Sequence, residues 1–148
     1  MSATIINFPS LHLILPNSGW TEHSTKDQYE FRLGDQEQVI VVFHLAHQRL
    51  GATEIQKIVT ELFRIRLQAA QKISGDSCSF DSPVCTQSGD RFDTSVFGHD
   101  GRQRFRLCFG FIGMPEKIVA VSYYDYTGSR SPEQFKSRAV AIISSIQI

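Results

Sequence analysis

Apolar and polar residues alternate in three short runs along the first third of the chain. The run "LHLIL" (11–15) is followed by "QYEFRL" (28–33), which has apolar side chains on one face and charged ones on the other. The third run, "EQVIVVFHLA" (37–46), is almost continuously β-branched or apolar. Alternation is typical of a half-buried strand, and a continuous β-branched run indicates a strand covered on both faces. These runs predict three strands.

The period of the pattern changes between Thr53 and Ile73. Apolar residues recur there every three or four positions, which predicts an amphipathic helix of about five turns. These positions are Ile55, Ile58, Val59, Leu62, Phe63, Ala69, Ala70 and Ile73. Thr53 with Gln56 matches a capping box, and Gly75 lies just past the last apolar position. We therefore expect one long helix in the middle of the chain.

Alternation returns after this helix and predicts four more strands. They cover about residues 78–87, 91–98, 102–112 and 116–126. A second helix begins near Ser131, which suits the N-cap, with Pro132 at the first helical position and Glu133 in the first turn. Runs of strands joined by short turns, with helices set apart from them, indicate an α+β fold. We predict one domain over residues 1–148, a single twisted antiparallel β-sheet of about six or seven strands packed by a long central helix and a C-terminal helix.

The stretch "HDGRQRFRLCFGFI" (99–112) combines a turn signal with a strand that has two different faces. Asp100-Gly101 favours a two-residue hairpin turn, because both central positions of that turn need a positive φ. Such a turn would pair Phe97 with Arg104 and would place the phenylalanines that follow on the core face. The arginines would then share the opposite face with Phe97.

Six residues around this hairpin are the candidate partner-binding residues. They are Phe97, Arg102, Arg104, Arg106, Tyr123 and Tyr124. The pairing of the next strand stays open, since a four-residue loop would place Tyr123 and Asp125 beside the arginines and a three-residue loop would place Tyr124 there. This arginine face is either an ordinary solvated surface or a docking surface for a partner.

Fifteen basic and fifteen acidic side chains leave the 148-residue chain without net charge. Nucleic-acid binders normally carry a basic excess or a basic stripe, so we expect no nucleic-acid partner. No run approaches the roughly 18 apolar residues of a spanning helix, and the first residues lack the basic start of a signal peptide. We therefore expect no membrane insertion.

The three cysteines lack CxxC spacing, which argues against a zinc site or a secreted disulfide framework. A pair between Cys78 and Cys85 stays open. With no sign of a secretory segment, the cysteine pattern predicts a reducing, cytoplasmic setting.

Sequence signals for catalysis are sparse. Gly75-Asp76-Ser77 matches the serine motif of one esterase class, but it lies far from the chain start and no Asp-x-x-His follows. We interpret it as turn chemistry. His44 and His47 would fall on opposite faces of a continuing strand, which does not suit a pair of metal ligands. We predict no catalytic residue, no metal site and no cofactor.

The N-terminal half has a recognisable layout, in which a strand that ends in proline is followed by a tryptophan, an aromatic strand and a β-branched strand. The residues that carry it are Leu13, Leu15, Pro16, Trp20, Phe31, Val39, Val41 and Val42. The layout resembles the DcrB-like and PsbP-like proteins, and the ending "SPEQFKSRAVAIISSIQI" is similar to the last helix of that family. The chain departs from the pattern by an extra residue before Trp20 and by the absence of the lipoprotein or signal segment of DcrB.

The resemblance implies one twisted antiparallel sheet with helices, in a family that mostly binds rather than catalyses. Cytoplasmic bacterial members of this length look like the Eag-type chaperones, which hold hydrophobic segments of type VI secretion effectors as homodimers. We therefore expect a non-enzymatic cytoplasmic protein-binding module, an accessory chaperone or adaptor for a secreted effector. One alternative is an immunity protein that neutralises a cognate toxin by direct binding, with the arginines steering it to an acidic surface. Another is a small enzyme whose site is assembled from scattered Asp, His and Ser residues.

Overall fold

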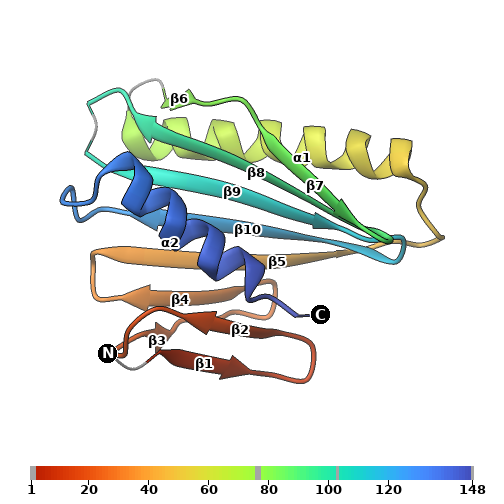
Figure 1. The fold of residues 1–148 in the computed structure, drawn as a ribbon, viewed down its shortest axis with the longest axis horizontal. Coiled ribbons are helices and arrows are strands. Elements are labelled where there is room, and N and C mark those ends of the chain that lie inside the picture. Colours follow the sequence, from red (N-terminus) through yellow and green to blue (C-terminus); the bar gives the residue numbers. More distant parts are fainter. Residues whose placement is uncertain (1–2, 76–77, 103, 148) are drawn as a thin grey trace.

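A large antiparallel sheet lies between two covering layers (Figure 1). The structure, a computed structural model, describes residues 3–75, 78–102 and 104–147. In chain order the elements are β1 (Thr4–Asn7), β2 (His12–Leu15), β3 (Thr21–Glu22), β4 (Tyr29–Leu33), β5 (Glu37–Leu45), α1 (Ala52–Ser74), β6 (Cys78–Phe80), β7 (Val84–Ser88), β8 (Arg91–Asp100), β9 (Arg106–Gly113), β10 (Lys117–Asp125) and α2 (Pro132–Ser144). The predicted α+β class is confirmed.

The main sheet has eight strands within the described ranges, in the order β3-β4-β5-β10-β9-β8-β6, with β7 also paired to β8. All of these pairs are antiparallel. The predicted strand 78–87 is divided into β6 and β7, which follow the same edge of β8. The predicted strand 11–15 corresponds to β2, which pairs with β1 in a separate hairpin rather than with the main sheet. The short strands β1 and β3 were not predicted.

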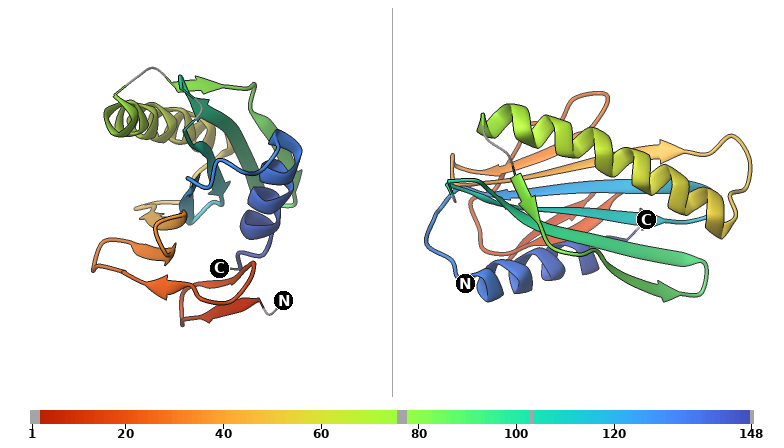
Figure 2. Two further views of the ribbon diagram at one scale, coloured as in Figure 1. Left: turned by 90° about the vertical axis from the view of Figure 1, so that its left-hand side faces the viewer. Right: turned by 90° about the horizontal axis from the view of Figure 1, so that it is seen from above.

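Both faces of the sheet are covered, and Figure 2 shows α1 and α2 on opposite sides of it. α1 covers a cluster that includes Leu107, Phe109, Phe111, Ala120 and Tyr124. α2 and the β1–β2 hairpin cover a second cluster that includes Leu11, Leu13, Val39, Val121, Tyr123, Phe135 and Ile142. The central strands are therefore buried on both sides, which explains their nearly continuous apolar sequences.

The two helix N-termini have different caps. α2 has the predicted start, because the Ser131 hydroxyl accepts a hydrogen bond from the backbone N–H of Gln134 and the Gln134 side chain accepts one from the Ser131 N–H. The capping box predicted for α1 is wrong. That helix begins at Ala52 with Gly51 in the cap position and no side-chain cap, so Thr53 already lies in its first turn. Its predicted C-terminal glycine, Gly75, has a left-handed φ of 69°.

The predicted two-residue turn after β8 is wrong. β8 and β9 pair His99 with Arg106 and Phe97 with Cys108, so the connection between them is longer than a two-residue turn. The reason is the buried Asp100 carboxylate, which accepts hydrogen bonds from the backbone N–H groups of Arg104 and Phe105. The register differs from the predicted one by an even number of residues, so each strand residue keeps its predicted face.

β9 and β10 pair with Tyr123 opposite Cys108 and Asp125 opposite Arg106. Tyr123 and Asp125 therefore lie on the same face as Arg106, as the four-residue alternative required, although Asp125 faces Arg106 rather than Arg104. None of the described helices is long and apolar enough to cross a membrane.

A buried ionic network joins α2 to this face of the sheet. The Glu37 carboxylate on β5 accepts hydrogen bonds from Arg138 Nε at 2.6 Å and Nη2 at 2.9 Å, and from the Tyr123 hydroxyl at 2.5 Å. Arg130 Nη1 donates to Asp125 at 2.8 Å and lies 3.4 Å from Glu37. The network fixes the position of α2 over the centre of the sheet.

Candidate functional site

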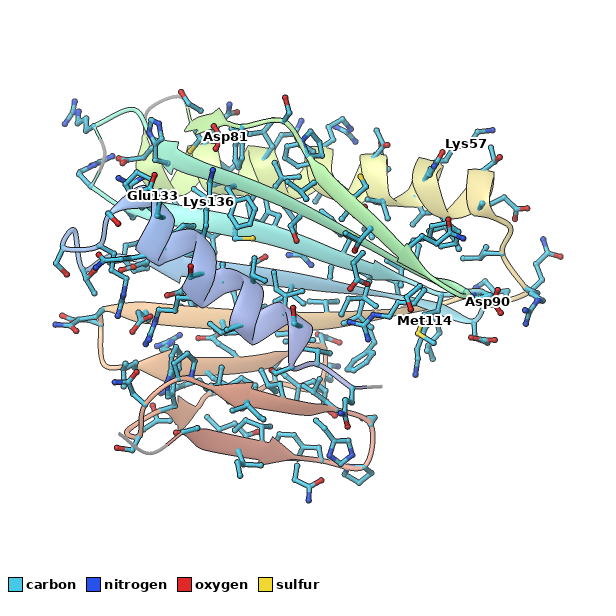
Figure 3. All side chains as sticks on the ribbon, viewed as in Figure 1. Lys57, Asp81, Asp90, Met114, Glu133 and Lys136 are labelled. Atoms are coloured by element: carbon cyan, nitrogen blue, oxygen red, sulfur yellow. The ribbon has the colours of Figure 1, made fainter. Side chains whose placement is uncertain are left out.

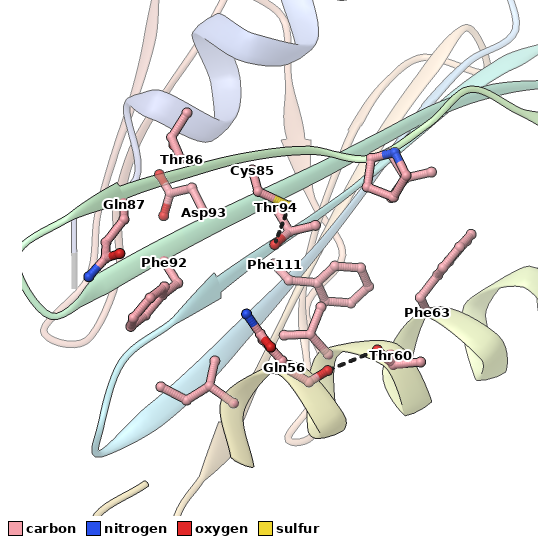
Figure 4. A pocket seen from close by; sticks show the side chains of 14 residues that line it. Gln56, Thr60, Phe63, Cys85, Thr86, Gln87, Phe92, Asp93, Thr94 and Phe111 are labelled. Carbon is pink, nitrogen blue, oxygen red and sulfur yellow. Dashed lines mark hydrogen bonds between the residues drawn. The ribbon is translucent and has the colours of Figure 1, made fainter. Parts of the chain in front are cut away.

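A cleft opens between α1 and the strands β7 and β8 at one edge of the sheet (Figure 4). Its volume is about 660 Å³. The helix contributes Ile55, Val59 and Phe63, which recur every four residues and so form one stripe along α1. This stripe is the predicted apolar face of the central helix, and part of it is left uncovered beside the sheet edge.

Strand alternation supplies the other wall of the cleft. Phe92 and Thr94 on β8 point toward α1, whereas Asp93 and Thr86 point to the opposite side of the sheet (Figure 4). Asp93 is paired there with Arg91 at 2.9 Å. The cleft is therefore lined mainly by apolar side chains, with a few uncharged polar groups at its rim.

Cys85 on β7 lies at this rim, and its Sγ accepts a hydrogen bond from the Thr94 hydroxyl at 3.8 Å. Cys85 is exposed and Cys78 is half-buried, and neither is part of a disulfide, so the pair left open by the sequence does not form. A cleft lined by apolar side chains, with a thiol and hydroxyl groups at its rim, is suited to binding through apolar contact rather than to acid–base catalysis.

β7 forms the outer boundary of the cleft. Its backbone pairs with β8 alone within the described chain, so its other side is unpaired. All five residues, "VCTQS" (84–88), are exposed and uncharged, and the Val84 side chain is 55% exposed. Sequence reasoning assigned a strand here but did not identify it as an edge. The sequence feature that could have indicated an edge strand was the absence of both apolar alternation and charged residues in segment 84–88.

Three of the six candidate partner-binding residues lie in the core, and the expectation of an exposed arginine and aromatic face is wrong for them. Phe97 and Tyr123 pack beneath Phe135 of α2, with ring centroids 6.5 Å and 5.3 Å from it. Tyr124 lies on the α1 side and is also buried. The physical reason is that α2 covers the face that carries Phe97 and Tyr123, whereas Tyr124 lies in the cluster covered by α1.

Lys136 of α2 further encloses Phe97. Its ammonium lies 5.6 Å from the centre of the Phe97 ring and 3.3 Å from the Asp81 carboxylate, and Figure 3 shows Lys136 and Asp81 beside one another. A lysine stem over an aromatic ring is a common way to close the rim of a core.

The three arginines of the predicted set are not in one strand. Arg102 and Arg104 lie exposed in the connection between β8 and β9, where Arg104 Nε donates to Asp100 at 2.8 Å. Arg106 is half-buried at the start of β9. The predicted alternating arginine stripe therefore does not form.

The remaining catalytic and metal candidates do not assemble in the described chain. Asp76 and Ser77 of the esterase-like tripeptide lie outside the described residues. In residues 3–75, 78–102 and 104–147, no group of three or more His, Cys, Asp or Glu side chains is placed to hold a metal ion. His44 is half-buried on β5, and His47 is exposed in the segment after it.

Comparison with known proteins identifies the fold. No family model and no curated protein matches the chain. Among solved structures, it is similar to the solution structure of cyanobacterial PsbP (CyanoP) from Synechocystis sp. PCC 6803, with a TM-score of 0.73 and 13% identity over 99% of this chain and 92% of that one. A Bacteroides thetaiotaomicron protein gives a TM-score of 0.44 at 13% identity, over 93% of this chain and 44% of that one. The chain thus has a PsbP-like α+β fold, which confirms that part of the resemblance predicted from sequence.

Proposed function

We propose that this protein is a non-enzymatic protein-binding module that holds an extended, uncharged segment of a protein partner along β7, with alternate side chains of that segment in the cleft. The observation that carries the proposal is the position of an unpaired, uncharged edge strand directly beside an apolar cleft. Each feature supplies one half of strand recognition, since backbone groups provide affinity and pockets provide side-chain specificity.

The exposed edge of β7 lacks the features that normally keep an unpaired edge strand from pairing with another chain. Natural sheets protect exposed edges with charged side chains, proline, bulges or a covering element. The segment 84–88 has no charged residue and no proline, and its side chains are exposed. Alternate residues of an edge strand direct their N–H and C=O groups outward, where an added strand would pair with them.

The cleft receives the side chains of such a strand. Alternate side chains of a strand added beside β7 would point to the α1 face, as Cys85 does. There they would meet Val59 and Phe63 of α1. Because the cleft is lined mainly by apolar groups, burial of valine-sized or leucine-sized side chains would drive binding.

Within this class, we propose the role of an accessory chaperone or adaptor for a secreted effector. A segment that must be kept from folding or aggregating before export exposes its backbone and apolar side chains, and this is the ligand that the edge and cleft would accommodate. The zero net charge of the chain also favours recognition by burial over electrostatic steering.

The experiment measures binding of a labelled peptide of alternating valine and threonine, followed by fluorescence anisotropy and by amide hydrogen exchange. Val59→Trp fills the cleft, and Val140→Trp is the matched control, because Val140 is a 48%-exposed helix valine outside it. We expect the peptide to slow exchange of the β7 amides. We also expect Val59→Trp to weaken binding at least tenfold, and Val140→Trp to leave it unchanged.

Equal binding by the two tryptophan variants, or a peptide that protects none of the β7 amides, would refute the proposal. Salt separates it from the immunity alternative, in which the exposed Arg102 and Arg104 meet an acidic toxin. Binding through the cleft should persist in 1 M salt, where the Debye length falls to about 3 Å, whereas arginine-driven binding should weaken.

A further inference from the structure

A small pocket lies at the end of the sheet where β10 ends and β9 begins, beside the connection from β10 to α2 (Figure 1). Its volume is about 100 Å³. The residues that line it are Phe105, Arg106, Asp125, Thr127, Gly128 and Arg130. Pockets that bury a drug-sized ligand measure about 300–1,000 Å³, so this one has room only for a small ion or for one charged group of a larger molecule.

Strand pairing places an arginine without a partner in this pocket. Arg106 of β9 pairs with Asp125 of β10, so both side chains point to the α2 face of the sheet. Arg106 is half-buried, yet its side chain forms no hydrogen bond or ion pair within residues 3–75, 78–102 and 104–147. A guanidinium is charged at every ordinary pH and has five N–H donors, which makes an unpaired one at the wall of a pocket a candidate ligand-binding group.

The Asp125 carboxylate is the acidic group of the pocket wall, and its oxygens are already occupied. Oδ1 accepts hydrogen bonds from the backbone N–H of Thr127 at 2.9 Å and from the hydroxyl of the same residue at 2.7 Å. Oδ2 accepts one from Arg130 Nη1 at 2.8 Å, and the Asp125 side chain is only 2% exposed. Asp125 therefore holds Arg130 at the pocket rather than pairing with Arg106.

The charges around the pocket leave a positive excess at Arg106. Glu37 accepts a hydrogen bond from Arg138 Nε at 2.6 Å and also lies 3.4 Å from Arg130 Nη1. Glu37 and Asp125 are thus engaged by two arginines, and within the described chain the charge of the third, Arg106, is not balanced. An anion bound beside Arg106 would balance it, in a pocket where water screens charge less than at an open surface.

The connection from β10 to α2 is fixed before any ligand binds. Thr127 is held by Asp125, and its Oγ1 accepts a hydrogen bond from the Ser129 N–H at 3.4 Å. Gly128 between them has a φ of 68°, a conformation that favours glycine, and Ser131 caps α2 shortly afterwards. Binding to a site that is already ordered costs less conformational entropy.

We propose that Arg106 and Arg130 bind a phosphate group in this pocket. Guanidinium groups donate paired, charge-assisted hydrogen bonds to phosphate oxygens, and two of them match the nearly two negative charges of a phosphate group at neutral pH. Arg130 keeps donors for this role, because its hydrogen bond to Asp125 uses Nη1. The phosphate is either the free ion or the phosphomonoester of a small metabolite. This site shares no lining residue with the cleft at β7 and does not depend on it.

The test titrates inorganic phosphate into the protein at constant ionic strength, with sodium chloride alone as the control for salt. Binding is measured by isothermal titration calorimetry and by the NMR shifts of the Arg106 Nε–H and of the Gly128 amide. We expect a Kd of about 1 mM or lower, and Arg106→Gln should weaken binding about tenfold or more by loss of hydrogen bonds to a charged group. Phenyl phosphate is the second probe. If it binds more tightly than inorganic phosphate, the ligand is a phosphomonoester, and if it binds equally or more weakly, the ligand is the free ion.

Arg102→Gln is the matched control, because Arg102 is exposed in the connection that precedes β9, carries the same charge and does not line the pocket. It should leave phosphate binding unchanged. Without ligand, Arg106→Gln should keep the Tm of the native protein, since it removes no hydrogen bond or ion pair within the described chain. Arg106→Lys keeps the charge but loses the paired donors, so its affinity should lie between those of Arg106→Gln and the native protein. Should Arg106→Gln not fold, Arg106→Lys provides the comparison. Absence of binding, NMR shifts equalled by sodium chloride, or equal weakening by Arg102→Gln and Arg106→Gln would overturn the proposal.

Discussion

Arg138→Met tests whether the buried network beneath α2 holds that helix on the sheet. The variant removes both hydrogen bonds from Arg138 to Glu37, whose carboxylate is only 1% exposed. Removing one partner of a buried ion pair typically costs about 3–5 kcal/mol. Arg130, 3.4 Å from the same carboxylate, and the Tyr123 hydroxyl remain as partners. We therefore expect the lower end of that range, about 3 kcal/mol of unfolding free energy.

The assay is urea unfolding followed by circular dichroism, with thermal unfolding as a second measure. For a chain of about 150 residues, 1 kcal/mol corresponds to about 2–4 °C, so the Tm should fall by about 6–12 °C. Arg64→Met is the matched control, because its pair with Glu61 is more than half exposed on both sides. Exposed pairs contribute about 0–1 kcal/mol, so this variant should change little.

A second substitution separates charge burial from simple loss of packing. Glu37→Gln in the Arg138→Met background removes the unpaired carboxylate and should restore part of the lost stability. The reasoning is refuted if Arg138→Met costs no more than Arg64→Met. It is equally refuted if adding Glu37→Gln to Arg138→Met lowers stability further.

Three further predictions concern the cysteines, a close backbone approach at Gly98 and the Asp100 carboxylate. Exposed Cys85 should react rapidly with dithionitrobenzoate. Cys108 is buried, and burial raises its pKa to about 12, so its thiol should react only when the protein unfolds. Rapid reaction of Cys108 in the folded protein would contradict the packing described. Gly98→Ala should lower the free energy of unfolding in urea by about 1–3 kcal/mol, because a Cβ at this position would lie 2.6 Å from a backbone oxygen of β6. An unchanged urea midpoint would exclude that close approach. The Asp100 carboxyl is buried, which raises its pKa, but hydrogen bonds from Arg104 and from two backbone N–H groups outweigh this and hold the pKa below its usual value. The Asp100 carboxylate therefore stabilises the fold above a pH of about 4, and this stabilisation is lost as the pH falls through the lowered pKa of the folded state. When urea midpoints are measured at a series of pH values, they should fall less steeply with acidification in Asp100→Asn than in the native protein. The same pH dependence in both proteins would contradict this.

Much of the fold follows from local sequence patterns. The period of three and four residues located α1, and Ser131 with Pro132 located the start of α2, because capping and periodicity act within a few residues. The register of β8 and β9 was displaced by an even number of residues, so the core face was still assigned correctly. The displacement came from the Asp100 side chain, whose hydrogen bonds to the following loop compete with a tight turn.

The candidate site was much less predictable, for a physical reason. Alternation in "RFRLCFGFI" reports that side chains point to two faces, but not whether a distant element covers the second face. Phe97 and Tyr123 were placed at the surface because nothing local indicates that α2 packs over them. Likewise, β7 becomes an edge strand only through the order in which all strands pair.

The β1–β2 hairpin depends on the far end of the chain for its packing. His12 exchanges two backbone hydrogen bonds with Gln147, and Leu11 and Leu13 share a cluster with Ile142 of α2. During synthesis, therefore, β1 and β2 would leave the ribosome well before α2, and their leucines would stay exposed until α2 has also emerged. Folding of this protein should accordingly complete only after α2 leaves the ribosome, with the N-terminal hairpin docking in one of the last steps.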